Sequence, residues 1–139
     1  PERERLERQA RDLGLAGIVE FMGHVADLDS AYREADLFVL PSLSEGLPNV
    51  LLEAAMLGVP VLSTNVGGVP FLFREREEAV LVPAGSATAL AQAIGDFLDA
   101  PEAWRSRAEA ARARVLREHA PASKARQMTG LWRSMTLAT

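Results

Sequence analysis

Two carboxylates, Glu45 and Glu53, stand eight residues apart in a segment whose other residues are mostly apolar. Pro48 lies between them at the predicted start of a helix. Residues four apart on a helix lie on one side of it, so Asn49 and Glu53 are predicted to share a face. A carboxylate accepts strong hydrogen bonds from paired hydroxyl groups, such as those of a ribose or a hexose. The spacing therefore predicts a site for a sugar-containing ligand where this helix meets the preceding loop.

Each carboxylate taken alone has a simpler interpretation. Glu53 could cap a loop or pair with an arginine, because burying a glutamate without a partner is costly. Glu45 alone is more often an exposed loop residue. The free N–H groups at the helix N-terminus suit a phosphate and would come from Leu47, Asn49 and Val50. The two glutamates together, in one loop and helix, are the stronger signal for a ligand site.

The elements that must position these residues alternate between strands and helices. Apolar runs bounded by turn residues predict strands over residues 17–23, 36–42, 59–64 and 78–82. Helical spacing of apolar residues, with caps and glycine stops, predicts helices over residues 2–13, 26–35, 47–58, 69–73, 87–98, 102–117 and 122–135. This alternation is typical of an α/β domain with a mostly parallel sheet. Ligands bind such sheets at the carboxyl ends of the strands, which selects the loops 22–26, 41–48 and 63–69.

Several local features sharpen these predictions. The run 36–42 is apolar without alternation, which predicts a strand covered on both faces. Asp27 or Asp29 is the expected N-cap of the second helix, and Ser86 that of the helix over 87–98. The inward face of the second helix is predicted to carry Leu28, Ala31, Tyr32 and Ala35.

Composition limits the classes of protein to which this chain can belong. Its 139 residues predict one domain, and 48% hydrophobic residues indicate a globular class. A formal net charge of −4 provides no attractive field for nucleic acid or an anionic membrane. The absence of cysteine excludes disulfides, thiolate metal sites and cysteine nucleophiles, and no apolar run is long enough to span a bilayer. A cytoplasmic location is expected, with peripheral membrane association left open for the full-length protein.

The stretch PSLSEGLPNVLLEAAMLGVPVLSTNVGGVP, residues 41–70, resembles the donor-binding signature of the retaining family 4 (group 1) glycosyltransferases. That signature has two glutamates separated by seven residues, preceded by Pro-Ser and followed by Gly-x-Pro-Val and a Gly-Gly loop. FMGHV (21–25) and YREADLFVLPS (32–42) are also similar, and the match extends through LVPAGSATALAQAI (81–94). The resemblance implies a GT-B fold, in which two Rossmann-like domains face a cleft. This chain would form the C-terminal one, with three layers and helices on both faces of its sheet.

The resemblance also implies a role for each matching residue. Glu53 would hold the ribose hydroxyls of the nucleotide, and Glu45, the expected catalytic residue, would contact hydroxyls of the donor sugar. The donor sugar and diphosphate would further contact Gly46, Leu47, Asn49, Gly67 and Gly68. The nucleotide would further contact Ser42, Gly23, His24 and Val25. The implied reaction transfers the sugar of a UDP-, GDP- or ADP-sugar to an acceptor with retention. No metal and no cofactor are expected, because fixed protein charges neutralise the departing diphosphate.

The glycine pair and His24 each allow a second interpretation, and one further residue, Phe71, departs from the family pattern. The Gly67-Gly68 pair could approach a diphosphate or simply form the turn. His24 could lie near the base or sugar, or make a local hydrogen bond as an ordinary loop histidine. Phe71 stands where the family often has a glutamate after the proline of its Gly-Gly-x-Pro loop.

The family's C-terminal domain usually begins with two further strands, which are associated with an Arg and Lys pair for the diphosphate. It also follows an acceptor-binding N-terminal domain. We therefore expect residues 1–139 to be an incomplete donor-binding domain, inactive by itself, in which residues 121–136 form a crossover helix. Two alternatives are a non-catalytic nucleotide-sugar binding module and a nucleotide-sugar epimerase of related architecture. The glutamate spacing argues against the epimerase, which needs acid and base residues from both domains. Sugar transfer by the full-length protein would exclude the binding module.

An exposed sheet edge predicts self-association of this chain. A sheet that lacks its first strands presents unpaired backbone groups, and Leu131 and Trp132 of the last helix would lose their cover. We expect dimers, which size-exclusion chromatography with light scattering would detect. A clean monomer at high concentration would contradict this expectation.

Overall fold

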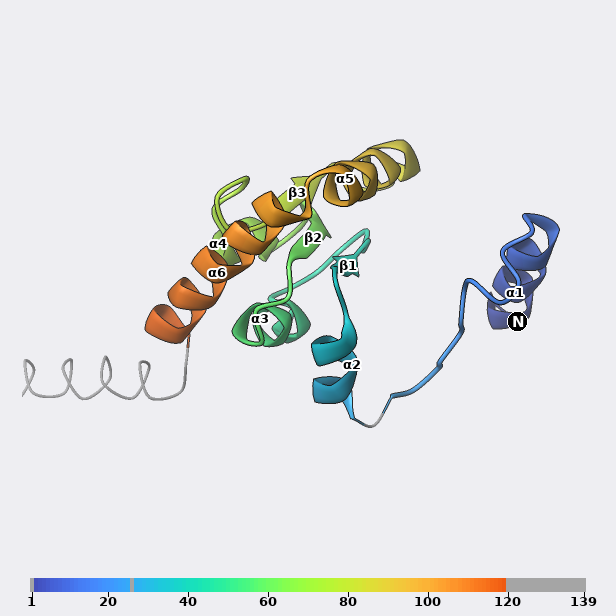
Figure 1. The fold of residues 1–139 in the computed structure, drawn as a ribbon, viewed down its shortest axis with the longest axis horizontal. Coiled ribbons are helices and arrows are strands. Elements are labelled where there is room, and N and C mark those ends of the chain that lie inside the picture. The colour runs from blue at the N-terminus through green and yellow to red at the C-terminus, as the bar shows by residue number, and fades with distance from the viewer. Residues whose placement is uncertain (1, 26, 120–139) are drawn as a thin grey trace, which may run out of the picture.

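The computed structural model describes residues 2–25 and 27–119, which form six helices and three strands (Figure 1). In chain order these elements are α1 (Glu2–Asp12), α2 (Leu28–Glu34), β1 (Phe38–Leu40), α3 (Asn49–Met56), β2 (Val61–Thr64), α4 (Val69–Leu72), β3 (Val80–Val82), α5 (Ala87–Asp99) and α6 (Pro101–Glu118). Strands and helices alternate from β1 to α5, as the sequence predicts. The helix predicted over 122–135, the crossover helix 121–136, and Leu131 and Trp132 lie outside the described residues.

The three strands form a parallel sheet in the order β1-β2-β3. Phe38 of β1 pairs with Val61 of β2, and Leu62 of β2 pairs with Val80 of β3. Successive residues of a strand point to opposite faces, and accordingly Val61 and Leu62 belong to two different hydrophobic clusters. Helices cover both of these faces, so the predicted α/β class with a mostly parallel sheet is confirmed.

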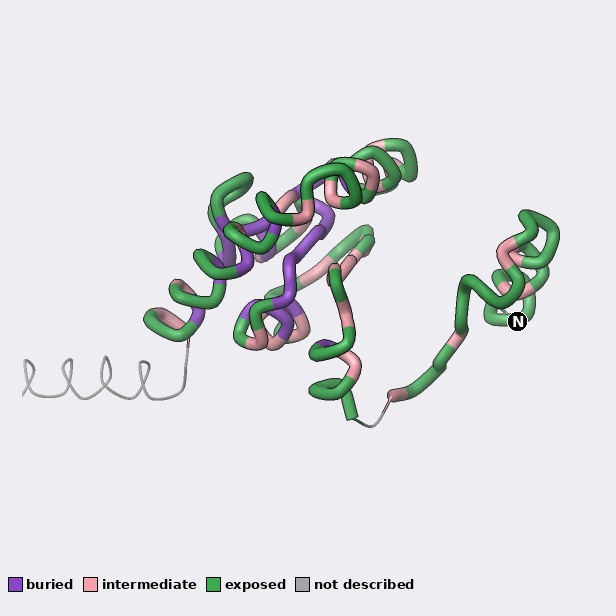
Figure 2. The backbone as a smooth tube through the Cα atoms, in the orientation of Figure 1, coloured by how far each residue is buried: buried purple, intermediate pink, exposed green. Residues whose placement is uncertain are grey.

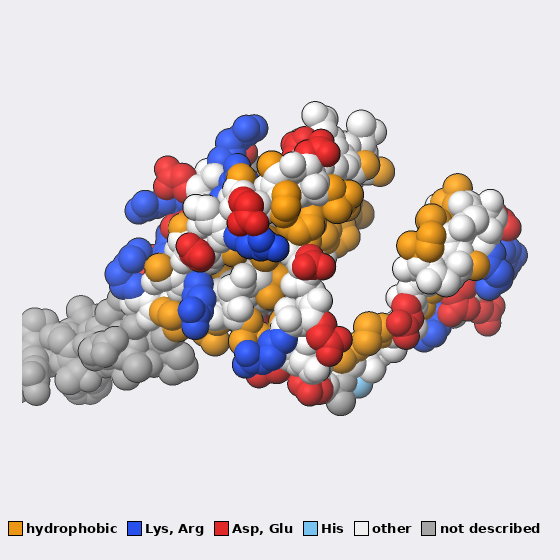
Figure 3. All heavy atoms as spheres, viewed as in Figure 1, with side chains coloured by type: hydrophobic (Ala, Val, Ile, Leu, Met, Phe, Trp, Pro, Cys, Tyr) orange, Lys and Arg blue, Asp and Glu red, His pale blue; other side chains and the backbone are white. Residues whose placement is uncertain are grey.

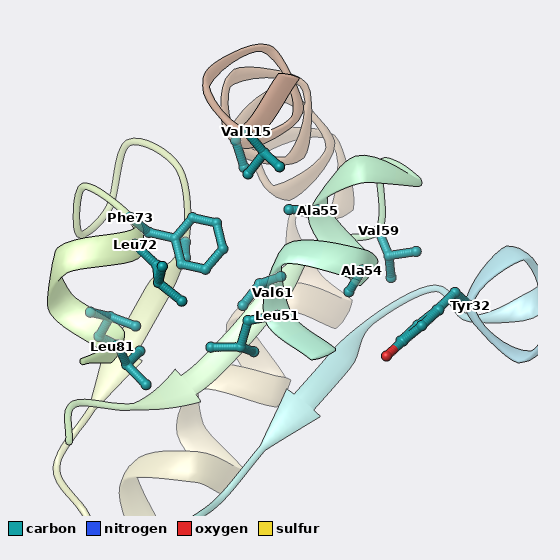
Figure 4. Close-up of a cluster of buried hydrophobic side chains, with 13 residues drawn as sticks. Tyr32, Leu51, Ala54, Ala55, Val59, Val61, Leu72, Phe73, Leu81 and Val115 are labelled. Carbon is teal, nitrogen blue, oxygen red and sulfur yellow. The ribbon is translucent and has the colours of Figure 1, made fainter. Parts of the chain in front are cut away.

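One face of the sheet is covered by α3, α4 and the C-terminal half of α6 (Figure 4). Leu51 of α3, Leu72 of α4 and Val115 of α6 are all fully buried in this cluster. Burying a leucine or valine side chain contributes about 1.5–3 kcal/mol. This packing holds the start of α3 against the strands, and α3 is the helix that carries Glu53.

The opposite face is covered by α5 and the start of α6. Leu62, Val82, Ala93 of α5 and Trp104 of α6 form its buried cluster. The ring of Trp104 meets that of Phe97 edge to face, with centroids 5.7 Å apart. The helix α6 therefore contributes to both clusters. Neither α6 nor any other helix within residues 2–25 and 27–119 is long and apolar enough to cross a membrane.

The helix α3 begins and ends as its sequence predicts. The sequence predicts Pro48 in the first turn of this helix, whereas in the structure Pro48 is the N-cap residue, one position before that turn. Its backbone is extended. Gly58 follows the C-cap residue Leu57 with φ +79°, a left-handed conformation in which side chains are strained. Ser86 caps α5 by accepting a hydrogen bond from the backbone N of Ala89. Asp27 similarly accepts from the backbone N of Ser30 and caps α2.

The strand predicted over residues 17–23 is wrong. Only an isolated bridge between Ala16 and Val19 forms there, and residues 20–25 have no regular structure. A strand requires a partner, and within the described residues β1 pairs with β2 alone. The same edge position explains why β1 is only half-buried, rather than covered on both faces as predicted (Figure 2).

The two N-terminal helices are less buried than their patterns suggest. Leu28 of α2 is 43% exposed, which contradicts its predicted inward position, whereas Tyr32 one turn later is 3% exposed. No residue of α1 is buried, and the helix stands apart from the sheet (Figures 1 and 2). Its Arg3 donates a hydrogen bond of 2.8 Å to the carbonyl oxygen of Phe21. The N-terminal part therefore contacts the segment that follows it.

The turn between α4 and β3 is held to α6 by a nearly buried carboxylate. Glu78, 6% exposed, accepts hydrogen bonds from the backbone N of Arg74 at 2.8 Å and from Nη1 of Arg114 at 2.9 Å. Arg114 also donates to Glu118 at 2.9 Å. The hydrogen bonds to Glu78 and Glu118 raise the pKa of Arg114 above its usual value. This ion-pair network fixes α6 over the sheet.

Candidate functional site

The loops that follow β1 and β2 meet at the carboxyl edge of the sheet. The backbone N of Gly68 donates to the carbonyl oxygen of Gly46 at 2.8 Å. The hydroxyl of Thr64 donates to the carbonyl oxygen of Ser42 at 2.6 Å. Residues 41–48 and 63–69, two of the three loops that the sequence selects, therefore form one continuous surface.

The Gly67-Gly68 pair allows this contact. A Cβ atom on Gly67 would lie 1.8 Å from the carbonyl oxygen of Glu45, and one on Gly68 would lie 2.2 Å from that of Gly46. Gly67 also has φ +51°, which favours glycine. Both glycines are thus required by the close approach of the loop 41–48. This contact between the loops is a structural reason for the two glycines, separate from the predicted contact with a diphosphate.

Glu45 is half-buried in this surface and has a defined partner. The hydroxyl of Ser42 donates to Oε1 of Glu45 at 2.5 Å. Ser42, which the resemblance assigns to nucleotide binding, therefore contacts the predicted catalytic residue. A short hydrogen bond of this kind limits the rotation of the carboxylate.

Glu53 lies in the second turn of α3 and is also half-buried. Its Oε2 accepts a hydrogen bond of 3.2 Å from the hydroxyl of Tyr32 in α2. The same hydroxyl lies 3.3 Å from the carbonyl oxygen of Val50. The partner of Glu53 is thus a tyrosine, rather than the loop or the arginine that the simpler interpretation suggests.

Tyr32 is the functional candidate that the sequence reasoning missed. Burial, and then the charge of Glu53, raise the pKa of Tyr32 to about 12, so its hydroxyl stays protonated and acts as a donor. Tyr32 is the only tyrosine of the chain, and its spacing marked it as an inward residue. The sequence does contain an indication of this role: the predicted inward position of Tyr32 buries its phenol hydroxyl, and a buried hydroxyl needs a hydrogen-bond partner.

The remaining predicted residues are divided between two places. Leu47 and Asn49 are exposed beside the N-terminus of α3, for which Pro48 provides no side-chain cap. Gly23, His24 and Val25 lie between α1 and α2, away from the loop that follows β1 (Figure 1). The structure thus brings together the loops 41–48 and 63–69 at the start of α3, the helix that carries Glu53, and does not bring residues 23–25 to them.

Arginine and acidic side chains are interspersed on the face of the molecule that Figure 3 shows. Within residues 2–25 and 27–119, no group of three or more His, Cys, Asp or Glu side chains could hold a metal ion. The side chains of Ser42, Glu45 and Thr64 place hydroxyl and carboxylate groups in these loops, and such groups suit hydrogen bonding to a polar ligand.

Comparison with known protein families identifies the chain. The family described as "Glycosyl transferases group 1" matches residues 1–100. The chain belongs to the group 1 glycosyltransferase family.

Individual relatives agree with this assignment to the group 1 glycosyltransferases. The D-inositol 3-phosphate glycosyltransferase of Streptomyces scabiei is 38% identical over 101 residues, which are 71% of this chain and 23% of that protein. Sucrose-phosphate synthase from Thermosynechococcus elongatus has a similar structure, with a TM-score of 0.83 and 34% identity over 99% of this chain and 35% of that one. Anabaena Alr3699/HepE, solved in complex with UDP, gives a TM-score of 0.86 and 25% identity over 94% of this chain and 36% of that one.

This group 1 glycosyltransferase chain has the α/β fold of its GT-B neighbours. It spans about a fifth of the length of the curated relatives that it matches. Its described site residues, Glu45 with Ser42 and Glu53 with Tyr32, lie within the matched residues 1–100.

Proposed function

We propose that this chain supplies the nucleotide-sugar donor site of a retaining glycosyltransferase. The observation that carries the proposal is a pair of half-buried carboxylates, Glu45 in the loop at the carboxyl edge of the parallel sheet and Glu53 in the helix that follows this loop. Each accepts a hydrogen bond from a hydroxyl group. Ligands of open α/β sheets bind at this edge. Membership of the group 1 family and a neighbour solved with UDP support the same ligand class.

Each part of the site has a role in this proposal. Glu53 accepts hydrogen bonds from the ribose hydroxyls, and Glu45 accepts them from hydroxyls of the donor sugar. The diphosphate lies near the N-terminus of α3, where backbone N–H groups and the positive end of the helix dipole favour an anion. Gly67 and Gly68 hold the loop of Glu45 in place through the close backbone approach.

The proposed reaction breaks the bond between the anomeric carbon and the diphosphate oxygen and forms a bond from that carbon to an acceptor oxygen. The nucleoside diphosphate leaves with the bonding electron pair, and its departing oxygen accepts the proton that the acceptor hydroxyl loses. Glu45 acts by orienting the sugar, because its oxygens accept hydrogen bonds from it. We further propose that the transfer proceeds with retention and without a metal. No observation favours the epimerase or the non-catalytic module.

Calorimetric titration of the full-length protein with UDP-, GDP- and ADP-sugars tests the proposal. Binding of one nucleotide is expected, and Glu53→Gln should weaken it by about ten- to a hundredfold, because a charge-assisted hydrogen bond contributes about 1.5–3 kcal/mol. Glu45→Ala should mainly lower the rate of sugar transfer in a steady-state assay. Glu109→Gln, a matched change of an exposed glutamate on α6, should behave as wild type. Unchanged donor affinity and rate in both site variants would refute the assignment.

A further inference from the structure

The side chain of Tyr32 extends from α2 to α3 and is almost fully buried. Its residue is 3% exposed, and its ring meets that of Phe38 in β1 edge to face, with centroids 5.3 Å apart at 67°. Figure 4 shows the ring at one edge of the buried cluster, with its oxygen pointing away from α2. Burial and the contact with Phe38 therefore restrict the ring, and the position of its hydroxyl is restricted with it.

The hydroxyl has one proton and two acceptors within reach. Oε2 of Glu53 lies at 3.2 Å and the carbonyl oxygen of Val50 at 3.3 Å. The carbonyl of Val50 is a neutral acceptor, whereas the carboxylate is charged and forms the stronger bond. Burial raises the pKa of Tyr32 to about 12, so the proton stays on the phenol at any physiological pH. The hydroxyl is thus a permanent donor to Glu53.

Because of this contact, the two carboxylate oxygens of Glu53 have different surroundings. Oε2 is bonded to Tyr32, and among the described residues no side chain donates to Oε1. A glutamate side chain that rotates freely loses conformational entropy when a ligand fixes it, and this loss weakens binding. A glutamate already held in one orientation avoids that loss, and its free oxygen is directed at a constant position.

We propose that Tyr32 is the positioning residue for Glu53, and that its hydroxyl orients this carboxylate so that Oε1 meets the ribose hydroxyls of the donor. The inference rests on the proposed function, because it requires Glu53 to bind the ribose. Tyr32 itself does not touch the ligand in this arrangement. Nothing in the sequence pattern or in the family description assigns it this role.

A double-mutant cycle in the full-length protein tests the inference. Donor affinity is measured for wild type, Tyr32→Phe, Glu53→Gln and the double variant, using whichever of UDP-, GDP- or ADP-sugar binds wild type. Phenylalanine keeps the ring contact with Phe38 and removes only the hydroxyl. We expect Tyr32→Phe to weaken binding about three- to tenfold in wild type and less than about twofold in the Glu53→Gln background. Equal losses in both backgrounds would overturn the inference.

A second readout separates positioning from general stability. The affinities of the nucleoside diphosphate and its 2′,3′-dideoxy form are compared, since only the former offers ribose hydroxyls. The ratio of the affinity for the nucleoside diphosphate to the affinity for the dideoxy form should be about three- to tenfold smaller in Tyr32→Phe than in wild type. It reports only on folded molecules, so it remains valid if the variant is partly unfolded. Ser86→Ala, which removes the cap of α5, should lower stability and leave the ratio unchanged.

The outcomes distinguish this inference from the proposed function. Failure of wild type to bind any of the three nucleotides, or an unchanged affinity in Glu53→Gln, would refute the proposed function and this inference with it. A weakened Glu53→Gln together with a wild-type affinity and ratio in Tyr32→Phe would refute the inference alone. A reduced ratio with non-additive losses would establish Tyr32 as the residue that orients Glu53.

Discussion

Replacing Gly68 with alanine will destabilise the full-length protein by about 1–3 kcal/mol and lower the rate of the proposed sugar transfer roughly a hundredfold. The added Cβ would lie 2.2 Å from the carbonyl oxygen of Gly46 and 3.1 Å from Cδ1 of Leu47. Gly68 has φ −82°, so the cost arises from this collision and not from backbone conformation. The obstructing oxygen belongs to the backbone and cannot rotate away. The loop that carries Glu45 must therefore move. Thermal unfolding and a steady-state transfer assay measure the two effects.

Gly95→Ala provides a control, because this substitution is expected to raise the stability of the protein where Gly68→Ala lowers it. Gly95 lies in α5, and nothing lies within 4 Å of a Cβ built there. Alanine in a helix interior is more stable than glycine by about 0.5–1 kcal/mol, so Gly95→Ala should raise the unfolding temperature and leave transfer unchanged. Wild-type stability and activity in Gly68→Ala would show that the two loops do not constrain each other.

Replacing Arg114 with methionine will destabilise the protein by about 3 kcal/mol. The side chains of Arg114 and Glu78 are 18% and 7% exposed and lie 2.9 Å apart. Methionine preserves the apolar stem of the arginine but leaves the Glu78 carboxylate without its counter-charge. The hydrogen bond from the backbone N of Arg74 remains as its contact. The free energy of unfolding, from urea titration, measures the loss.

Arg117→Met is the matched control for this ion pair. Arg117 also pairs with a glutamate at 2.9 Å, but its side chain is 62% exposed. Exposed pairs contribute about 0–1 kcal/mol, so the control should lose no more than this. A similar loss in Arg114→Met and Arg117→Met would show that burial does not strengthen the Glu78 pair.

Much of the local structure could be predicted from the sequence. Ser86 and Asp27 cap their helices, Gly58 follows the end of α3, and β2 is buried as its apolar run predicts. These features depend on hydrogen bonds and steric limits that act over a few residues. The two carboxylates and their loop were identifiable for the same reason, since helical spacing alone places Asn49 and Glu53 on one side.

Other predictions failed because they depend on a partner elsewhere in the chain. Residues 17–23 have strand character, but a strand forms only where a neighbour supplies backbone groups, and only the bridge from Ala16 to Val19 forms. Leu28 fits the helical pattern of α2 and is nevertheless 43% exposed, because no element within residues 2–25 and 27–119 covers it fully. The arginine-rich helix α6 carries Arg114, which binds the nearly buried Glu78, and no pattern within α6 itself indicates this partner.

The sequence by itself therefore determined the α/β class, the helix caps, the loop in which Glu45 lies and the helix that carries Glu53. The tertiary structure alone decided which groups hold them. Tyr32 reaches Glu53 across 21 residues, and Gly68 donates to Gly46 from the neighbouring loop. Such contacts depend on how helices and loops pack around the sheet. No periodicity or local propensity encodes that packing, because it is set by the combined burial of side chains from separate parts of the chain.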